Sequence, residues 1–410
     1  MPHALAAVRG SALRRVRLGP LLVDGHRVTV RNTRLSDFER WREIRLRDRE
    51  FIEPYWNSSA LSWADRHSRA WWIREYLRLR WGWATGRVLP LSVVVDGEFA
   101  GQCGLDPIDR RHRAGEMGIW MDSRHARHGV GALACALMVD YAFGPLGLHR
   151  VTAPTAVSNR PAHRSTGRGG MTLEATMIRA RAVGGQRRDH ELWAVTADRV
   201  PPGGWVAALI TVGGVRAEPV TRDDIATADD PAQRLRDTTR WTAAVLTVGA
   251  KYALSTLLHG LAAAARGATT WPSTIDGVDP DNRPITLRQE TSHHPRRRAA
   301  SHRYDVLADG RSIGHLNLTP GHSNAELTIG ITAESAPAKA AATAIALLLT
   351  TAFDELGEER VQTLIDPTHT ELIALAEAGG LRREGLLHDA RRGPDGRFHD
   401  AELWAATVQK

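Results

Sequence analysis

Cysteine is scarce in this sequence, and its scarcity limits the chemistry that the chain can use. Only two cysteines, Cys103 and Cys135, occur among 410 residues. So few thiols cannot form a disulfide framework and are typical of a reducing compartment. Neither cysteine has a metal-ligand neighbour at the usual spacing. We therefore expect two small buried hydrophobic side chains, no bound metal and a cytoplasmic protein.

The sequence also lacks the continuous apolar core of a secretory signal, because its first twenty residues place basic residues after a short apolar stretch. One segment, residues 241–265, is long enough to span a bilayer. Its only formal charge is Lys251, near the centre, where a lysine costs about 3 kcal/mol on insertion scales. We therefore expect a helix buried between domains and no membrane insertion.

Charge of one sign is not concentrated anywhere along the chain. The net charge is +8, from 54 basic and 46 acidic residues. Nearly all basic residues are arginines scattered among Asp and Glu, and the dense runs, residues 187–188 and 296–298, are short. Net charge alone reports a tendency to associate and not a site. We do not expect nucleic-acid binding.

The chain contains an internal repeat, as its length for two domains allows. The segment LMVDYAFGPLGLHRV at 137–151 returns 210 positions later as LLLTTAFDELGEERV at 347–361. Three further pairs follow the same order: GEFAGQCGL (97–105) with GRSIGHLNL (310–318), GGM (169–171) with GGL (379–381), and ELWAVT (191–196) with ELWAAT (402–407). We infer one fold present twice, with an incomplete second copy, since the pattern before Gly310 is obscure and residues 291–303 read as a polar, histidine-rich loop.

The first copy reads as alternating strands and helices. Capping boxes predict helices that open at Ser36 and at Ser62. Strands are expected at 28–31, 89–95, 99–105 and 116–121, and an apolar helix at 133–143, closed by Gly144 and Pro145. Seven of the thirteen tryptophans lie between positions 41 and 83. Core packing accounts for most of them, and an acceptor cleft is the alternative.

The most informative stretch is ARHGVGA at 126–132, between a predicted strand and a predicted helix. A glycine pair that enters a helix exposes backbone N–H groups and lets a ligand approach the main chain closely. The helix N-terminus adds a favourable potential for an anion. This loop is therefore a candidate pyrophosphate site, although G-x-G alone is a weak signal.

Two linked motifs resemble the GNAT superfamily of acyl-CoA N-acyltransferases, and within it the branch of ribosomal-protein N-terminal acetyltransferases. They are Glu116-Met117-Gly118-Ile119-Trp120 and Ala126-Arg127-His128-Gly129-Val130-Gly131. The segment AFGPLGLHRV and the pair Leu192-Trp193 extend the resemblance over about residues 23–200. It implies an α+β (α/β GNAT) fold, a mixed, mostly antiparallel central sheet flanked by helices.

The resemblance also implies roles for individual residues. Glu116 would be the general base, taking a proton from the acceptor amine through a water. Asn159 would contact the donor or a water. The main chain of Ile119, Trp120 and Met121 would pair with the pantetheine arm of acetyl-CoA or another acyl-CoA. The pyrophosphate would be held by the amides of Arg127, His128, Gly129, Val130, Gly131 and Ala132.

Two departures from the family pattern concern the same site. Ala126 replaces the usual Arg or Gln, so one phosphate contact is missing, and Ala162 replaces the usual Ser. Residues 161–170 are also richer in Gly and Arg than the helix expected there. The acid that protonates the leaving thiolate is therefore unassigned, with Ser158, Ser165 and Tyr141 as candidates.

The sequence thus predicts an N-acyltransferase that moves an acetyl or longer acyl group to a primary amine by direct attack. The acceptor is either a peptide or protein N-terminus or a small amine, and a homodimer is compatible with the pattern. The alternative is a non-catalytic acyl-CoA-binding regulator or scaffold. We expect an N-terminal extension (1–22), a catalytic domain (23–200), a linker with a helical segment (201–285) and a degenerate domain (286–410).

The degenerate copy is not expected to bind the donor. At the offset of 210, Gly129 aligns with Lys339, Gly131 with Ala341 and Asn159 with His369. A Cβ at each lost glycine would fill the space that a pyrophosphate needs against the main chain.

Overall fold

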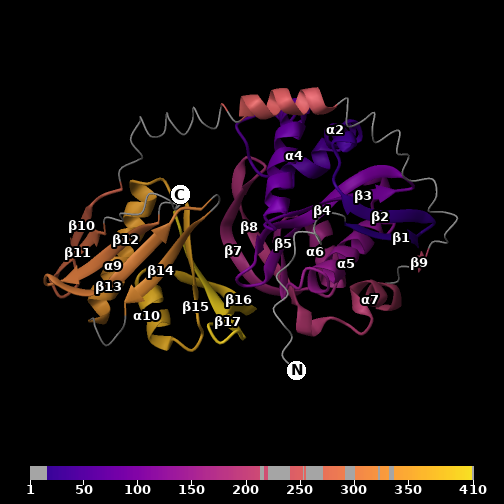
Figure 1. Cartoon of the computed structure of the whole chain (residues 1–410). Coiled ribbons are helices and arrows are strands. Elements are labelled where there is room, and N and C mark those ends of the chain that lie inside the picture. Colours follow the sequence, from indigo (N-terminus) through magenta and orange to yellow (C-terminus); the bar gives the residue numbers. More distant parts are fainter. Residues whose placement is uncertain are drawn as a thin grey trace. The chain divides into compact units, whose positions relative to one another are not determined.

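The computed structural model shown in Figure 1 describes residues 16–212, 217–219, 241–252, 254, 271–290, 301–321, 324–331 and 337–408. The chain divides into two compact units. Unit 1 comprises Met1–Leu173, Val183–Gly185 and Leu192–Ala262; unit 2 comprises Glu174–Ala182, Gln186–Glu191 and Ala263–Lys410. The first part of the predicted loop at 291–303, residues 291–300, lies outside the described residues.

The sheet of unit 1 is antiparallel from β9 through β1, β2, β3 and β4 to β5, then turns parallel between β5 and β6. Beyond β6 it continues with the last part of β8, residues 192–196, whereas residues 186–191 of β8 and 174–182 of β7 belong to unit 2. The strands are β1 (Arg17–Val23), β2 (His26–Asn32), β3 (Leu89–Val95), β4 (Glu98–Asp109), β5 (Ala114–Met121), β6 (Arg150–Ala156), β7 (Thr172–Val183), β8 (Gln186–Thr196) and β9 (Ala217–Pro219). The expected mixed, mostly antiparallel sheet is confirmed for this unit.

Helices cover both faces of this sheet, with α2 and α4 on one side and α5 and α7 on the other (Figure 1). Side chains alternate along β5, so Met117 packs in the core under α5, whereas Trp120 packs in the core under α2 and α4. The helical segments are η1 (Leu35–Asp37), α2 (Phe38–Arg47), α3 (Arg49–Ile52), η2 (Glu53–Tyr55), η3 (Asp65–His67), α4 (Arg69–Ala84), η4 (Ser123–His125), α5 (Val130–Phe143), α6 (Arg160–Arg168), η5 (Ala197–Arg199) and α7 (Gly204–Val212).

The helix predicted to open at Ser36 begins elsewhere. A 3₁₀ turn comes first, and its entry is fixed by Asp37, whose carboxylate accepts the backbone N–H of Arg34 at 2.8 Å. The same carboxylate binds Arg31 at 2.7 Å and the hydroxyl of Ser92 at 3.0 Å. Because Asp37 makes these buried bonds, α2 starts only at Phe38, and Ser36 is not its cap.

The second capping box also begins a shorter helical segment than predicted. The expected pair forms, since the Ser62 hydroxyl donates to Asp65 at 2.6 Å, but it opens only the single turn η3. The long helix α4 begins after Ser68, whose hydroxyl accepts the N–H of Trp71 at 3.3 Å. A cap nearer to the apolar run therefore sets the start of this helix.

The apolar segment 241–265 is described only at 241–252 and 254, where it is helical. Trp241 is buried and packs edge-on against Phe38, with ring centroids 6.0 Å apart. Further along, Leu246 and Leu254 are 67% and 57% exposed. The burial that we expected thus applies to the start of the segment. In the described part of the chain no helix has the length and apolar character needed to cross a membrane.

Unit 2 has its own sheet and core. Strands β10 to β14 pair antiparallel in order, β15 lies parallel to β14, and β17 separates β15 from β16. The elements are β10 (Thr274–Val278), β11 (Pro284–Gln289), β12 (His302–Ala308), β13 (Arg311–Thr319), β14 (Ala325–Ile331), α9 (Ala338–Asp354), β15 (Arg360–Ile365), α10 (Thr370–Ala378), β16 (Arg382–Arg392) and β17 (Phe398–Thr407).

A buried ion pair lies inside unit 2. Arg360 on β15 has a fully buried side chain and donates to both carboxylate oxygens of Glu384 on β16, at 2.6 and 2.7 Å. Arg360 also donates to the carbonyl of Ile178, and Glu384 accepts the N–H of the same residue at 2.8 Å. The segment of β7 that belongs to unit 2 is thus hydrogen-bonded to this pair.

Candidate active site

The sheet of unit 1 divides where its parallel pair begins. Strands β5 and β6 are paired at Ala114, Gly115 and Glu116, opposite Arg150, Val151 and Thr152. The pairing of β5 with β6 ends at Glu116, whereas β4 stays paired with β5 as far as Met121. We call the diverging parts, 117–121 of β5 and 153–156 of β6, the fork. Glu116, half-buried, lies at its base.

The open edge of β5 has the properties expected of a ligand-binding strand. Gly118 and Ile119 are exposed, and the Ile119 side chain keeps 39% of its surface accessible although it is apolar. At Gly118 an added Cβ would meet no atom within 4 Å. An extended ligand could therefore add to this edge by main-chain hydrogen bonds, as a further strand would.

The predicted pyrophosphate loop follows the tip of β5 and leads into α5. Gly129 is the N-cap of α5 with a φ of +77°, a conformation that favours glycine. The first i→i−4 bond runs from the N–H of Leu133 to the carbonyl of Gly129, at 2.9 Å. The N–H groups of Val130, Gly131 and Ala132 therefore stand at the helix start with the favourable end of its dipole. Arg127, with a φ of +72°, is exposed.

A group of histidines flanks this loop, which sequence reasoning did not identify. His128 Nδ1 lies 2.5 Å from a carboxylate oxygen of Asp24, and His26 Nδ1 lies 2.8 Å from Asp96. The His26 ring packs edge-on against the rings of His128 and His125, with centroids 5.6 and 5.4 Å apart. Burial lowers the pKa of His125. Because these residues come from three separate turns, no local pattern joins them.

The C-terminal end of α2 is fixed to the tip of β5 by a charged network. Asp48 accepts the N–H and hydroxyl of Ser123 at 2.8 and 2.9 Å, and Arg47 bonds both Asp48 and Asp122. Burial by itself would raise the pKa of Asp48, but the hydrogen bonds from Arg47 and Ser123 lower it. Burial raises the pKa of Asp122, which is fully buried. The network holds the C-terminal end of α2 against the end of β5, where the fork is open. We call this end of the fork its mouth.

Asn159 and the helix after it differ in part from what the resemblance implies. The side-chain oxygen of Asn159 caps α6 by accepting the N–H of Ala162 at 3.3 Å. Helix α6 is present over Arg160–Arg168 despite its glycine and arginine content. The carbonyl of Ser158, just before this cap, lies 3.4 Å from the hydroxyl of Tyr55.

None of the three candidates for the thiolate acid is singled out by its surroundings. Ser165 is exposed on α6, and Ser158 is exposed beyond the end of β6. Tyr141 packs against the core of unit 1 from the C-terminal half of α5, and burial raises the pKa of its phenol. Tyr55, which the sequence did not suggest, is the hydroxyl that the structure places beside Ser158.

Four tryptophans and Arg45 form a cluster at α2. The sequence indicates this cluster only by its excess of tryptophan. Trp41, Trp63 and Trp72 are buried core residues, which confirms the core interpretation for them. Trp56 is 37% exposed and stacks on the guanidinium of Arg45, whose carbon lies 3.6 Å from the ring centroid.

Both cysteines are unsuited to act as nucleophiles. Cys103 is buried, and Cys135 is half-buried against the core of unit 1. Burial raises the pKa of the Cys103 thiol well above its ordinary value and that of Cys135 to about 12. Since the thiolate is the reactive form, these residues are the small hydrophobic side chains that we predicted, and they favour direct transfer over a covalent thioester.

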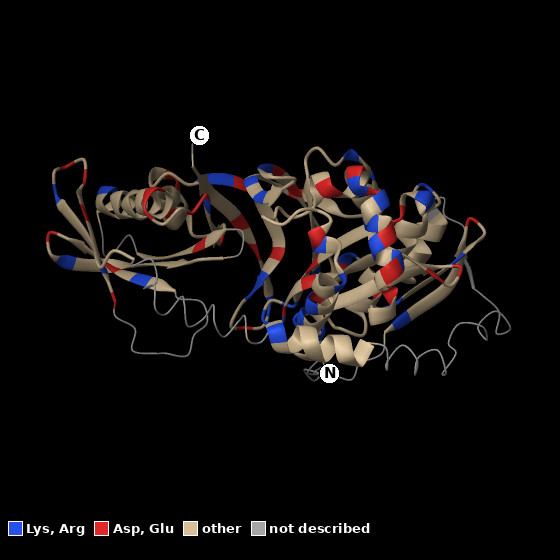
Figure 2. Ribbon diagram, turned by 90° about the horizontal axis from the view of Figure 1, so that it is seen from above, with Lys and Arg blue, Asp and Glu red and all other residues tan. Residues whose placement is uncertain are grey.

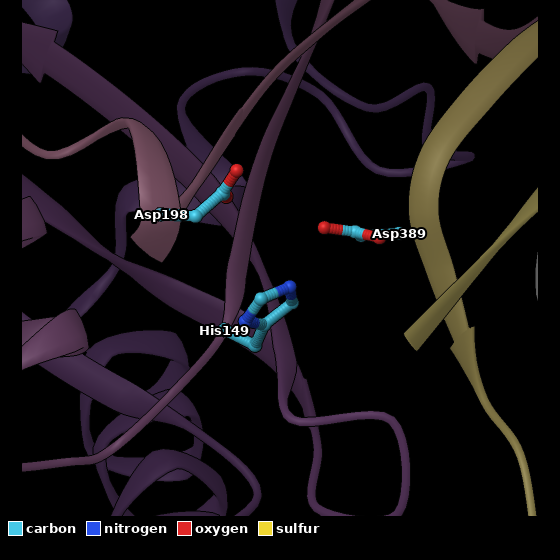
Figure 3. Close-up of side chains that lie close together, drawn as sticks. All are labelled: His149, Asp198 and Asp389. Carbon is cyan, nitrogen blue, oxygen red and sulfur yellow. The ribbon is translucent and has the colours of Figure 1, made fainter. Parts of the chain in front are cut away.

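His149 and Asp198 of unit 1 lie near each other, with a ring nitrogen and a carboxylate oxygen within 4.8 Å (Figure 3). A hydrogen bond from the Thr196 side chain lowers the pKa of Asp198, and the imidazole adds to this effect. His149 precedes β6 at the end of the strand opposite to Asn159. Two side chains are fewer than the ligands of a protein zinc site. Asp389, also drawn in Figure 3, belongs to unit 2 and is not part of this pair.

Comparisons with known proteins agree with this arrangement. Residues 27–172 match the sequence family described as the acetyltransferase (GNAT) domain. RimJ from Mycobacterium smegmatis, solved in complex with CoA-disulfide, is 31% identical over 51% of this chain and 99% of its own, with a TM-score of 0.48. The chain belongs to the GNAT acetyltransferase family. It is an enzyme that uses an acyl-CoA and an amine.

Two further GNAT structures show the range of relatives. The ribosomal-protein-S5-alanine acetyltransferase from Vibrio fischeri is 20% identical over 42% of this chain and 94% of its own, with a TM-score of 0.39. The microcin C7 self-immunity acetyltransferase MccE, in complex with acetyl-CoA and AMP, is 16% identical over 41% and 92%, with a TM-score of 0.38. No curated protein matches the sequence significantly.

Proposed function

We propose that unit 1 transfers an acetyl group from acetyl-CoA to the amino terminus of a peptide or protein. The observation that carries this proposal is the fork, whose base holds a half-buried carboxylate and whose tip leads to the N-terminus of α5. The motifs that resemble the branch of ribosomal-protein N-terminal acetyltransferases support a peptide acceptor over a small amine.

Donor binding would use the residues that the sequence singled out. The open edge of β5 at Ile119, Trp120 and Met121 would take the pantetheine arm, and Asn159 would face the donor or a water. Bound acyl-CoA supplies a thioester that an amine can attack. The pyrophosphate would be held at the start of α5 by amides of Arg127, His128, Gly129, Val130, Gly131 and Ala132.

Glu116 is the proposed general base. An amine attacks only when neutral, so a carboxylate that accepts its proton through a water promotes the reaction. The proton then resides on Glu116, and the leaving thiolate takes a proton from another group. Tyr55, beside Ser158 at the end of β6, joins the earlier candidates for this acid.

Unit 2 is proposed to be a degenerate copy of the same fold. Its parallel pair has the register Ala325 opposite Val361, and adding 210 to the pair Gly115 and Val151 of unit 1 gives these two positions. A helix also follows β14, as α5 follows β5. We propose the divisions 1–22, 23–200, 201–285 and 286–410 on this basis, with catalysis confined to 23–200.

The alternative, a regulator that binds acyl-CoA without turnover, is favoured by two features of the segment after β6. The Asn159 oxygen is used to cap α6, and Ala162 stands where the family has a hydroxyl. This alternative shares acyl-CoA binding with the proposed enzyme and differs from it only in the absence of acetyl transfer.

Thiol release tests the proposal. The protein is incubated with acetyl-CoA and either peptides with free amino termini, the same peptides with acetylated amino termini, or polyamines. We expect free thiol only with the free peptides. Thiol release with polyamines alone would contradict the peptide acceptor, and CoA binding without acceptor-dependent release would favour the regulator.

A further inference from the structure

Arg45 is a buried cation that has no anionic partner among the residues that the structure describes. Its side chain is 1% exposed, at the end of α2. The guanidinium carbon lies 3.6, 4.7 and 5.0 Å from the ring centroids of Trp56, Trp63 and Trp120. These rings cover the faces of the group, so a further ligand can reach it only along its edge.

Only some of the N–H groups along the edge of this guanidinium donate hydrogen bonds. Nε donates to His67 Nε2 at 2.9 Å, whereas Nη1 is buried and has no hydrogen-bond partner among the described residues. A buried N–H without a partner is rare and needs an explanation. The unpaired donor of Arg45 therefore points to a group that is supplied from outside the chain.

The surroundings add positive charge instead of neutralising it. The guanidinium carbon of Arg66 lies over the ring of the same tryptophan, Trp63, 5.0 Å from its centroid, and the buried Nε of Arg66 also has no partner in the described structure. The nearest carboxylate given for Arg66 is Glu53, at 3.8 Å. Burial, and secondly the charge of Arg66, lower the pKa of Arg45 to about 9. Aromatic faces attract a cation but do not supply the acceptor that Nη1 lacks.

The cluster lies at the mouth of the fork. Trp120 belongs to the diverging part of β5, on the same strand face as Glu116, because the two positions differ by four. The neighbour of Trp56, Tyr55, has its hydroxyl 3.4 Å from the carbonyl of Ser158, just beyond β6. Tyr55 thus lies beside the chain that follows β6, and Arg45 lies between Trp56 and Trp120 of β5, 3.6 and 5.0 Å from their ring centroids.

We propose that Arg45 binds a carboxylate of the acceptor, so that the enzyme selects peptides with an acidic residue near their amino terminus. This inference rests on the proposed function of the same site. A guanidinium edge matches a carboxylate in geometry and charge. The acceptor must also reach Glu116, so its amine and its carboxylate are held at opposite ends of one stretch of β5.

The spacing limits where the acidic residue can stand. Trp120 lies four positions after Glu116, roughly 13 Å along the strand at the usual rise. One extended peptide residue spans roughly 3.3–3.6 Å. A carboxylate at the second, third or fourth residue of the acceptor can therefore reach Arg45 while the amino group lies at Glu116. A single amino acid is too short.

Binding, measured without turnover, tests this proposal. The full-length protein is saturated with CoA, which has no acyl group, and titrated with two C-amidated hexapeptides by calorimetry. Their sequences are Ser-Glu-Glu-Glu-Ala-Ala and Ser-Gln-Gln-Gln-Ala-Ala, each with a free amino terminus. We expect the acidic peptide to bind at least about tenfold more tightly, as a charged hydrogen bond predicts. Equal affinity, or no binding of either peptide at millimolar concentration, would overturn the proposal.

Variants separate the buried arginine from general charge attraction. In Arg45→Met the preference for the acidic peptide should disappear, whereas Arg42→Met, which removes an exposed arginine of the same helix, should change it by less than about twofold. Arg45→Lys, which keeps the charge, should retain part of the preference and provides a second variant if Arg45→Met does not fold. A preference that survives in Arg45→Met would show that Arg45 has only a structural role.

The result that would contradict the proposed transferase activity differs from the result that would contradict the recognition site. If no amine releases thiol from acetyl-CoA, but the acidic peptide still binds more tightly and this depends on Arg45, the recognition site is correct and the reaction is not. If thiol is released equally from both peptides, with equal KM, the reaction is correct and the recognition site is not.

Discussion

Arg45 and His67 form a buried hydrogen bond in which Nε of the arginine donates to Nε2 of the histidine at 2.9 Å. Both side chains are 1% exposed. Since a guanidinium can only donate, Nε2 of His67 carries no proton, and its Nδ1 donates to the carbonyl of Trp63. His67 is therefore neutral in the folded protein and holds Arg45 in place.

The first prediction concerns stability at acidic pH. Burial, with the charges of Arg45 and Arg66, lowers the pKa of His67 to about 4. The unfolded chain binds this proton below pH 6.5 or so, whereas the folded protein does not. The contribution of His67 to stability is thus complete above that pH and falls between pH 6.5 and 4, by about 3 kcal/mol in all.

Denaturant unfolding followed by tryptophan fluorescence checks this dependence. At pH 7.5 His67→Gln loses stability through the packing and the two hydrogen bonds of His67, and this loss does not depend on the protonation of an imidazole. At pH 5 the difference between the wild type and His67→Gln should shrink by about 2 kcal/mol, because the wild type has lost most of its advantage. The same difference at both pH values would show that His67 accepts a proton in the folded state.

A second prediction concerns the donor loop. A Cβ at Gly131 would lie 3.5 Å from Met121 and 3.9 Å from Ile119, ordinary contacts that the fold can accommodate. A valine there would fill the space between α5 and the open edge of β5. Gly131→Val should weaken CoA binding about tenfold or more, by the loss of hydrogen bonds to a charged group, as measured by calorimetry. Gly249→Val, in the helical segment 241–252, is the matched control, and unchanged CoA affinity in Gly131→Val would refute the loop assignment.

The third prediction concerns the proposed base. Glu116→Gln keeps the shape of the side chain and removes its ability to accept a proton. Turnover with acetyl-CoA and a peptide should fall by about a hundredfold or more, while CoA affinity stays near normal. Glu98→Gln, at the exposed first residue of β4, should leave both quantities unchanged. Equal rates for Glu116→Gln and the wild type at neutral pH would remove Glu116 from the mechanism.

The fourth prediction concerns the buried pair of unit 2. Glu384→Gln leaves Arg360 fully buried without its counter-charge, which typically costs 3–5 kcal/mol. Glu290, paired with Arg303 at 3.1 Å, is about half exposed, and Glu290→Gln should cost less than about 1 kcal/mol. Equal thermal shifts for the two variants would mean that the Arg360–Glu384 pair contributes nothing beyond a surface pair.

Sequence patterns predicted those elements whose signal is local and repeated. The strands at 89–95 and 99–105, with the turn between them, have the φ values of +51° at Asp96 and +92° at Gly97 that a tight hairpin requires. The apolar helix through Phe143 was also predicted, with Gly144 as its cap. Helix starts were predicted wrongly where two caps compete. Asp37 is held by a tertiary contact with Ser92 that no short window contains, whereas Ser68 caps α4 by a local bond to Trp71, six residues after the serine that was predicted.

The group formed by Arg45 with Trp56, Trp63 and Trp120 could not be predicted, because Trp120 is distant from the others in sequence. Arg45 reads as one of several arginines on the polar face of a helix, and only folding brings Trp120 beside it. The excess of tryptophan between positions 41 and 83 was the one available signal, and it did not separate the exposed Trp56 from the buried Trp41 and Trp72. The places of Glu116 on a strand and of Gly129 before a helix, by contrast, follow from motifs in consecutive residues.

The last prediction is that each chain binds one CoA, because the helix start of unit 2 is closed to a phosphate group. Helix α9 begins after Pro337, which has no N–H to donate. Ala340 and Ala341, in its first turn, are fully buried. Lys339 pairs with Asp281 at 2.6 Å, so its ammonium already has a carboxylate partner. Calorimetric titration should give one CoA per chain, lost in Gly131→Val and kept in Lys339→Ala. Two equivalent sites, or one site that disappears in Lys339→Ala, would place the donor in unit 2 and contradict the assignment of catalysis to unit 1.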